Sequence, residues 1–267
     1  MIIDAHLHFF HDKIASTTIN ELKNIAKIEP TTLGNRASSE EYLKKNYIDK
    51  AFLLNIATKA KNNVRINDFA ISNNDDKFIS FGSINPYFAG YEEELDRLVA
   101  SGIKGIKFHP QYQNFDLGDK AHYPIYKAAE KRNLLMSFHM GFDPYVPDCD
   151  FAAPKKLAQI AREINPKLII AAHFGGYLCW EEVLKDLSKS NVNMDTSIGL
   201  YHTGSINIDV FKRILDNLGI DNLIFASDTP WGRFNETINF INDLGLSEKE
   251  KEKVFYQNAL RLLKLMN

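Results

Sequence analysis

The sequence predicts one α/β domain over residues 1–267, folded as a (β/α)8 barrel of the TIM type. Three observations support this fold. Short apolar runs of strand length recur eight times, amphipathic helical stretches separate them, and 267 residues suffice for eight such units. A doubly wound open sheet is the alternative, but no glycine-rich nucleotide-binding loop follows the first apolar run, which disfavours it.

The predicted strands begin at the N-terminus and recur along the whole chain. They span residues 1–8, 50–56, 78–85, 103–109, 134–140, 167–173, 191–197 and 222–228. The segments between them repeat apolar residues at helical spacing. In one of them Pro154 suits a first helical turn, and Leu157 and Ile160 share a face. Similar patterns occupy residues 91–101, 122–132 and 207–218.

Two segments exceed what a minimal barrel needs. Residues 9–48 carry helical patterns near 16–28 and 39–47. They are too long for a simple connection, so they predict an insert within the domain that caps or walls a pocket. Residues 247–265 follow the eighth unit and predict one or two closing helices. The side chains expected to turn inward are Val254, Ala259, Leu262 and Leu263.

The composition restricts the kinds of partner. The net charge is −2, from 32 basic and 34 acidic residues that are well mixed, which argues against nucleic acid. No apolar run approaches the roughly 18 residues of a membrane span, and no signal peptide is visible. Cys149 and Cys179 form no disulfide framework, which favours a reducing cytoplasm. We therefore expect a cytoplasmic protein with a small-molecule substrate.

The first strand carries an unusual polar face. Asp4, His6 and His8 alternate with apolar residues, so they share one side of the strand. Two imidazoles placed two residues apart can share a metal ion. Two surface histidines near a chain terminus are the alternative, and this stretch alone leaves both interpretations open.

Histidines also end several other predicted strands. His109, His139 and His173 end the fourth, fifth and sixth strands, and Asp228 ends the eighth. In a (β/α)8 barrel, the carboxyl ends of the strands carry the catalytic groups. A single histidine is more often a solvated or hydrogen-bonded residue, but five at one rim favour a metal site. Imidazoles with a carboxylate suit zinc and accept manganese, iron or cobalt.

The motifs around these residues resemble the amidohydrolase superfamily, and most closely its amidohydrolase-2 branch, which includes aminocarboxymuconate semialdehyde decarboxylase. They are Asp4-Ala-His-Leu-His8, Gly105-Ile-Lys-Phe-His-Pro110, Ser137-Phe-His-Met-Gly141, Ala172-His-Phe-Gly-Gly176, Ala226-Ser-Asp-Thr-Pro230 and Asn258-Ala-Leu-Arg-Leu-Leu263. The resemblance covers nearly the whole chain. It implies a barrel that holds a divalent metal, usually zinc, and that is often a homodimer.

The resemblance also implies roles for the rim residues. The metal ligands are His6, His8, His139 and Asp228. His173 becomes the acid–base group, and Asp228 also accepts a proton from water. Asp4 is then either a group behind the ligands or a structural carboxylate in the barrel.

Lys107 leaves the number of ions open. A carboxylated Lys107, together with His173, would hold a second ion in two-metal members of the superfamily. One ion is favoured, because the flanking motifs match the amidohydrolase-2 branch. The alternative role for Lys107 is substrate binding.

Substrate-binding candidates are less specific. His109 is expected to touch substrate or to support a ligand, and Trp231 to line the pocket or pack over the barrel mouth. Arg36 could hold a substrate carboxylate, although most such arginines are surface charges. His202 could face substrate or solvent, and His122 is expected at the surface.

The expected activity is hydrolysis of an amide, ester or lactone by metal-activated water. The alternatives are non-oxidative decarboxylation of an aromatic or unsaturated acid, and a barrel that binds metal or ligand without catalysis.

Overall fold

The computed structural model describes residues 1–147, 149–197 and 207–265, and it confirms the (β/α)8 barrel. All neighbouring strands pair in parallel, in the order β1 to β8. Two backbone hydrogen bonds close the ring, from Ala5 to Phe225 and from His8 to Thr229. The strands are β1 (Ile3–Leu7), β2 (Lys50–Leu54), β3 (Phe78–Ser83), β4 (Gly105–Phe108), β5 (Leu135–Phe138), β6 (Ile169–Ala171), β7 (Asn193–Asp195) and β8 (Leu223–Ile224).

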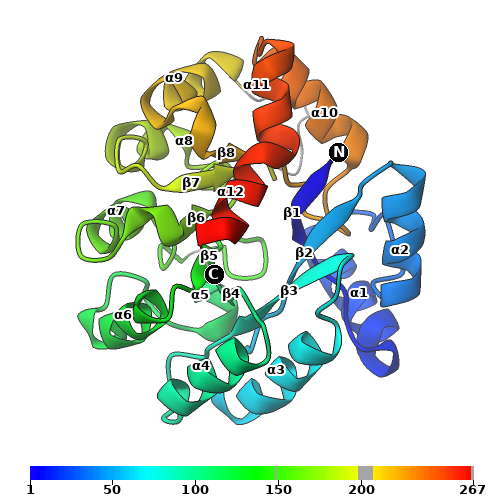
Figure 1. Cartoon of the computed structure of the whole chain (residues 1–267), viewed down its shortest axis with the longest axis vertical. Coiled ribbons are helices and arrows are strands. Elements are labelled where there is room, and N and C mark those ends of the chain that lie inside the picture. Colours follow the sequence, from blue (N-terminus) through cyan, green and yellow to red (C-terminus); the bar gives the residue numbers. More distant parts are fainter. Residues whose placement is uncertain (148, 198–206, 266–267) are drawn as a thin grey trace.

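Helices surround the strands (Figure 1). They are α1 (Asp12–Ala26), α2 (Arg36–Lys45), α3 (Asn63–Ser72), α4 (Tyr91–Ala100), α5 (Pro110–Gln113), α6 (Tyr123–Lys131), α7 (Pro154–Ile160), α8 (Trp180–Glu182), α9 (Ile208–Leu218), α10 (Phe234–Asp243), α11 (Glu248–Glu252) and α12 (Asn258–Leu265). Short 3-10 turns lie at Ala60–Asn62, Lys120–His122, Pro166–Leu168 and Ile220–Asn222, and π-helical turns follow α8 and α11 at Val183–Leu187 and Lys253–Gln257. None of the described helices is long and apolar enough to cross a membrane.

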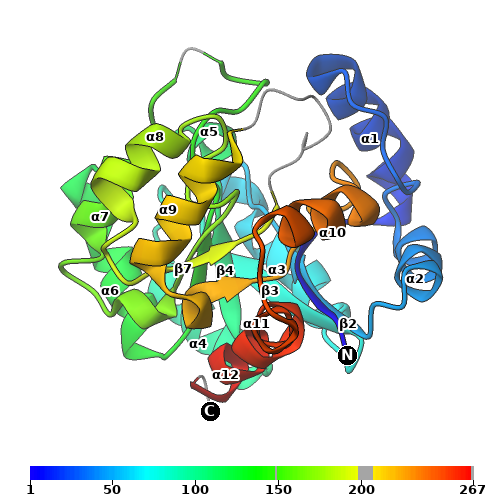
Figure 2. The ribbon, with the colours of Figure 1, turned by 90° about the horizontal axis from the view of Figure 1, so that it is seen from above.

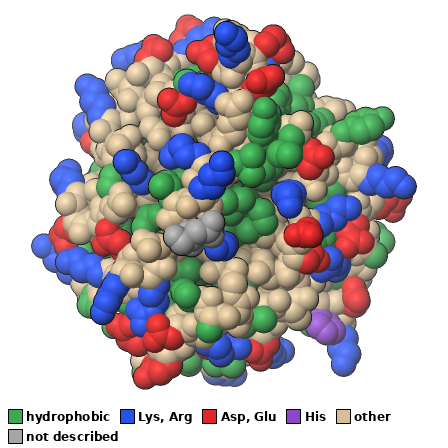
Figure 3. All heavy atoms as spheres, viewed as in Figure 1, with side chains coloured by type: hydrophobic (Ala, Val, Ile, Leu, Met, Phe, Trp, Pro, Cys, Tyr) green, Lys and Arg blue, Asp and Glu red, His purple; other side chains and the backbone are tan. Residues whose placement is uncertain are grey.

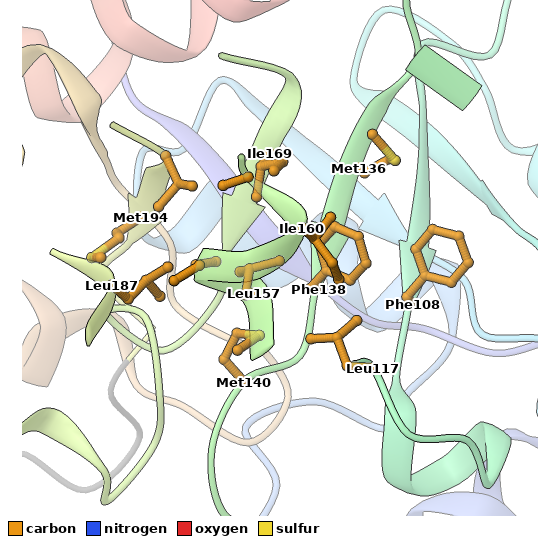
Figure 4. Packing of buried hydrophobic residues seen from close by; sticks show 14 of the residues in the cluster. Phe108, Leu117, Met136, Phe138, Met140, Leu157, Ile160, Ile169, Leu187 and Met194 are labelled. Carbon is orange, nitrogen blue, oxygen red and sulfur yellow. The ribbon is translucent and has the colours of Figure 1, made fainter. Parts of the chain in front are cut away.

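The core lies between the sheet and its helices (Figure 4). Phe108 and Phe138, on neighbouring strands, stack with ring centroids 5.1 Å apart, and Tyr126 of α6 packs edge-on against both. Each such buried ring stabilises the fold by about 1.5–3 kcal/mol. Because strand side chains alternate, these outward rings leave Lys107 and His109 on the side of the barrel axis.

The two ends of the barrel differ. Figure 2 shows α11 and α12 beneath the barrel, at the end where the chain begins, and α1 near the opposite end. Asn258 of α12 donates to the carbonyl of Leu223 in β8, which ties the closing helix to the sheet. On the face that carries α12, basic and acidic side chains are interspersed (Figure 3). The carboxyl ends of the strands, where the candidate residues lie, face the opposite end.

Some predicted boundaries move for local reasons. The insert helices begin earlier than the patterns near 16–28 and 39–47 indicate, because His11 and Asn35 cap them by accepting hydrogen bonds from Lys13 and Ser38. In the closing segment, Val254, Ala259 and Leu262 are buried as predicted, whereas Leu263 is only partly buried.

Two other sequence predictions are wrong. Strand β8 ends at Ile224, because the hydroxyl of Thr196 replaces a ladder partner for the Ala226 amide. The surface position predicted for His122 is also wrong: it is 6% exposed and packs edge-on against Tyr87 and Phe115.

Candidate metal and catalytic site

Three of the predicted ligands form a compact group of donor atoms. Nε2 of His6 lies 3.1 Å from Nε2 of His8. Oδ1 of Asp228 lies 3.4 Å from the first nitrogen and 3.5 Å from the second. Ligands about 2.0–2.1 Å from a tetrahedral ion lie about 3.3–3.4 Å from one another. The triangle therefore has the dimensions of a divalent-metal site.

The protonation of the two imidazoles follows from their other nitrogens. Nδ1 of His6 lies 3.0 Å from a carboxylate oxygen of Asp195, and Nδ1 of His8 lies 2.8 Å from the carbonyl of Leu54. Both partners are acceptors, so each Nδ1 donates. Burial lowers the pKa of His6 well below its usual value and that of His8 to about 3, so both rings are neutral.

Each Nε2 then carries a lone pair, and the third corner, Oδ1 of Asp228, is also an acceptor. Two imidazole lone pairs and a carboxylate oxygen that converge on one point are a donor set that a divalent cation neutralises. The residues therefore fit a divalent ion, with His6, His8 and Asp228 as ligands.

Asp228 reaches this position through a tight turn. Its backbone is left-handed at φ 59°, and its carbonyl accepts hydrogen bonds from the amides of Trp231 and Gly232. A Cβ on Gly232 would lie 1.8 Å from the carbonyl oxygen of Ser227, so the turn requires glycine there. Burial raises the pKa of Asp228 well above its usual value. Its side chain is 16% exposed, which leaves the triangle open on this side.

His173, the predicted acid–base group, lies next to the triangle. Its ring centroid is 5.2 Å from that of His6, and its backbone is also left-handed, at φ 61°. Non-glycine residues in this region are uncommon and concentrate at functional sites. Nδ1 donates to the carbonyl of Ser197 at 2.7 Å, and Nε2 lies 2.9 Å from Nδ1 of His139. Burial lowers the pKa of His173 to about 4.

His139 belongs to a second group of donors, with His109 and Asp143. Its ring stacks on that of His109, with centroids 3.9 Å apart, and its buried Nε2 lies 4.0 Å from the carboxylate of Asp143 without a hydrogen bond. Tyr112 stacks on the other face of His109 at 3.8 Å. Among the described residues, His139 is not in the group of His6, His8 and Asp228, and its role as fourth ligand stays a prediction.

Lys107 is fully buried beside these groups. Its ammonium lies 3.5 Å from the hydroxyl of Ser137, and no carboxylate in the described part of the chain lies within 4 Å of it. Burial lowers its pKa to about 8, against the opposing charges of Asp195 and Asp228. Because no carboxylate of the described residues contacts this buried ammonium directly, it suits an anionic ligand.

The remaining residues predicted from the sequence to bind substrate lie in different parts of the structure. Arg36 is not at the site, and this prediction is wrong: α2 carries it toward the start of β3, where it pairs with Asp75 and Glu40. Trp231 is partly buried three residues after Asp228, and its contact with substrate stays a prediction. His202 lies outside the described residues.

The sequence predictions missed two acidic residues. Asp195 ends β7 and hydrogen-bonds to the ring of His6. The predicted strand 191–197 continues past Asp195, so the rule that selected Asp228, a carboxylate at the end of a predicted strand, selects Asp195 only with the observed end of β7. Asp143 lies in the loop after β5, where no periodic pattern exists to single it out.

Comparison with models of protein families shows the family of the chain. The model of an amidohydrolase family, Amidohydro_2, matches residues 3–265. The chain belongs to this amidohydrolase family. This confirms the resemblance based on the motifs. No curated protein matches the chain.

Solved structures share the fold of this amidohydrolase at low identity. An uncharacterised TIM-barrel protein from Bordetella bronchiseptica has a TM-score of 0.77 at 17% identity, with 99% of each chain covered. 2,6-Dihydroxybenzoate decarboxylase from Rhizobium has a TM-score of 0.67 at 16% identity, and the match covers 100% of this chain and 99% of the decarboxylase chain. Dihydroxybenzoic acid decarboxylase from Polaromonas, solved with bound manganese and the inhibitor 2-nitroresorcinol, has a TM-score of 0.67 at 14% identity. The match covers 100% of this chain and 97% of the decarboxylase chain.

Proposed function

We propose that this amidohydrolase-family enzyme is a metal-dependent decarboxylase that releases carbon dioxide from an aromatic or unsaturated carboxylic acid. One observation carries the proposal: a donor triangle for one ion lies near a buried ammonium, Lys107, which no carboxylate of the described residues contacts directly. A substrate carboxylate balances both charges, whereas a neutral amide or ester does not. The similar folds of the dihydroxybenzoate decarboxylases support the same choice.

His6, His8 and Asp228 would hold the ion, and we assign His139 as the fourth ligand from the family motif. When bound, a divalent ion supplies a positive charge that orients the carboxylate and draws electron density from the reacting carbon. The donor set accepts zinc or manganese. Manganese is bound in the Polaromonas decarboxylase of similar fold, so both ions merit testing.

The protein groups handle the proton that decarboxylation requires. The bond between the substrate carbon and its carboxylate breaks, carbon dioxide leaves, and the electron pair stays on the carbon, which then takes up a proton. Nε2 is the atom of His173 that can exchange this proton, because Nδ1 donates to Ser197. Nδ1 of His139 lies 2.9 Å from this atom, so His139 positions the ring of His173.

Hydrolysis of an amide, ester or lactone is the second candidate. Asp228 favours it, because its carboxylate lies beside the position of the ion and can accept a proton from an attacking water there. The open side of the triangle at Asp228 would admit that water.

The two activities separate in one experiment. Enzyme loaded with zinc or manganese is incubated with hydroxybenzoates and unsaturated acids, and released carbon dioxide is measured. A parallel panel contains esters, lactones and amides, and His6→Gln serves as the metal-site control in both. We expect carbon dioxide release that His6→Gln abolishes. Turnover confined to the hydrolytic panel would establish the second candidate instead, and a metal-loaded protein inert in both panels would favour a non-catalytic role.

A further inference from the structure

Asp195 contacts both the metal ligand His6 and the acid–base candidate His173. One carboxylate oxygen, Oδ2, accepts a hydrogen bond from Nδ1 of His6 at 3.0 Å. The other, Oδ1, accepts from the backbone amides of His173 at 2.9 Å and Ser197 at 3.1 Å, and from the Ser197 hydroxyl. The residue is fully buried. All of these neighbours donate, so the position requires a group that only accepts.

We propose that Asp195 is a positioning residue: it selects the tautomer of His6 that can bind metal, and it holds the turn that presents His173. Metal affinity and the placement of the acid–base group therefore depend on one carboxylate. This inference concerns the metal site itself and does not depend on whether the reaction is decarboxylation or hydrolysis.

The first half of the argument concerns His6. A neutral imidazole carries one proton, and Nε2 is free for metal only while that proton stays on Nδ1. The carboxylate of Asp195 keeps it there. For His8 the same task falls to a backbone carbonyl, that of Leu54, which substitution cannot remove. Of the two groups that accept from these Nδ1 atoms, only the side chain of Asp195 can therefore be tested by mutation.

The second half concerns the turn after β6. His173 and Phe174 both have left-handed backbones, at φ 61° and 52°. Such conformations persist only where surrounding contacts hold them. The amide of His173 donates to Asp195, and the amide of Phe174 donates to the Asp195 backbone carbonyl at 2.9 Å. Asp195 therefore accepts from both residues of the turn.

Asp195→Asn keeps the shape and reverses one contact. If the amide oxygen replaces Oδ1, the amide NH2 faces Nδ1 of His6. The imidazole must then accept there and carry its proton on Nε2, inside the donor triangle. If the amide turns over, its NH2 faces the donating groups of His173 and Ser197 instead. Both orientations disturb the site, the first through metal binding and the second through the turn.

The test measures metal affinity and tautomer, without a substrate. Zinc affinity of wild type and Asp195→Asn is determined by competition with a chelator, and 15N NMR of histidine-labelled, metal-free protein reports the tautomer of His6. We expect binding weakened by about 10–100-fold, and a shift of the His6 proton from Nδ1 to Nε2. Glu94→Gln is the matched control, because Glu94 is also a buried carboxylate and lies in a separate network with Asn67 and Arg97. It should bind zinc as wild type does.

Three results would overturn the inference. One is zinc affinity of Asp195→Asn within threefold of wild type. Another is an unchanged His6 tautomer in that variant together with an unchanged backbone amide signal of His173, because an amide that turned over would keep the tautomer but lose the contact with the turn. The third needs no variant, so it holds even if Asp195→Asn does not fold: metal-free wild type whose His6 carries its proton on Nε2.

Discussion

Nε2 of His6 and Nε2 of His8 lie 3.1 Å apart, and the acceptors beside both Nδ1 atoms leave each Nε2 with a lone pair. Two lone pairs at that separation repel each other when both imidazoles are neutral. The chain nevertheless directs both rings to this point through acceptors on their far sides, Asp195 and the carbonyl of Leu54. Ligand-orienting partners of this kind are typical of metal-binding histidines.

Metal removal should therefore destabilise the folded protein. An ion that binds only the native state stabilises it by about 2.7 kcal/mol at a free concentration one hundred times its Kd. Thermal unfolding with zinc and with a chelator should show a lower Tm in the chelator, and His8→Gln should abolish the difference. His11→Gln is the control, because His11 is exposed and should retain the full shift. Equal Tm values with and without metal in wild type would contradict the site.

Replacement of His173 should slow the reaction while the metal stays bound. General acid–base groups contribute about 10²–10⁴-fold to the rate. His173→Gln should lower kcat by that range with the substrate found in the panel experiment. Metal content by elemental analysis should match wild type, because the ring lies beside the donor triangle and not in it. A kcat within a few-fold of wild type would remove His173 from the acid–base role.

A methyl group at Gly232 should disturb the metal site indirectly. A Cβ there would lie 1.8 Å from the backbone carbonyl of Ser227, which cannot rotate away, so the turn that presents Asp228 must open. Overpacking of this kind costs about 1–3 kcal/mol. Gly232→Ala should lower both Tm and zinc affinity, the latter by about tenfold for each 1.4 kcal/mol transmitted to the bound state.

Gly118→Ala is the control for this change. The nearest group to its added methyl is the flexible side chain of Lys156 at 3.1 Å, so Tm and zinc affinity should stay near wild type. Wild-type zinc affinity in Gly232→Ala would show that the turn does not govern the position of Asp228.

The rim of the barrel was predictable because two regular geometries combine. Alternation along β1 puts His6 and His8 on one face, and parallel strands bring that face to the same rim as Asp228. Strand alternation and parallel pairing alone predict that these three residues lie together. Asp195 also lies at this rim, but the predicted strand continues to residue 197 and so does not mark it as a strand end.

The orientations of the side chains could not be predicted in this way. Rotation about the side-chain bonds of His139 decides which of its nitrogens faces the donor triangle. That rotation depends on neighbours such as His173 and Asp143. The position of Arg36 depends on where α2 begins and which face it turns outward. Loop residues such as Asp143 have no period from which to infer a direction.

The buried carboxylate of Glu94 should make stability depend on pH. Burial acts to raise its pKa, but hydrogen bonds from Arg97 and Asn67 prevail and lower it below the usual 4.5. A carboxylate with a depressed pKa in the folded state contributes stability above its unfolded pKa and loses it as pH falls through the folded value. The contribution of Glu94 should thus be complete at pH 7 and decline below about pH 4.5.

Urea unfolding of wild type and Glu94→Gln measures this contribution. Loss of hydrogen bonds to a charged group costs about 1.5–3 kcal/mol, so Glu94→Gln should be less stable than wild type by that amount at pH 7. The gap in unfolding free energy should narrow as pH falls below 4.5, because wild-type Glu94 becomes protonated while the amide does not titrate. Asp119→Asn is the control, since Asp119 is exposed and caps only a short 3-10 turn. A gap that stays constant with pH would assign the effect of Glu94→Gln to packing and not to charge.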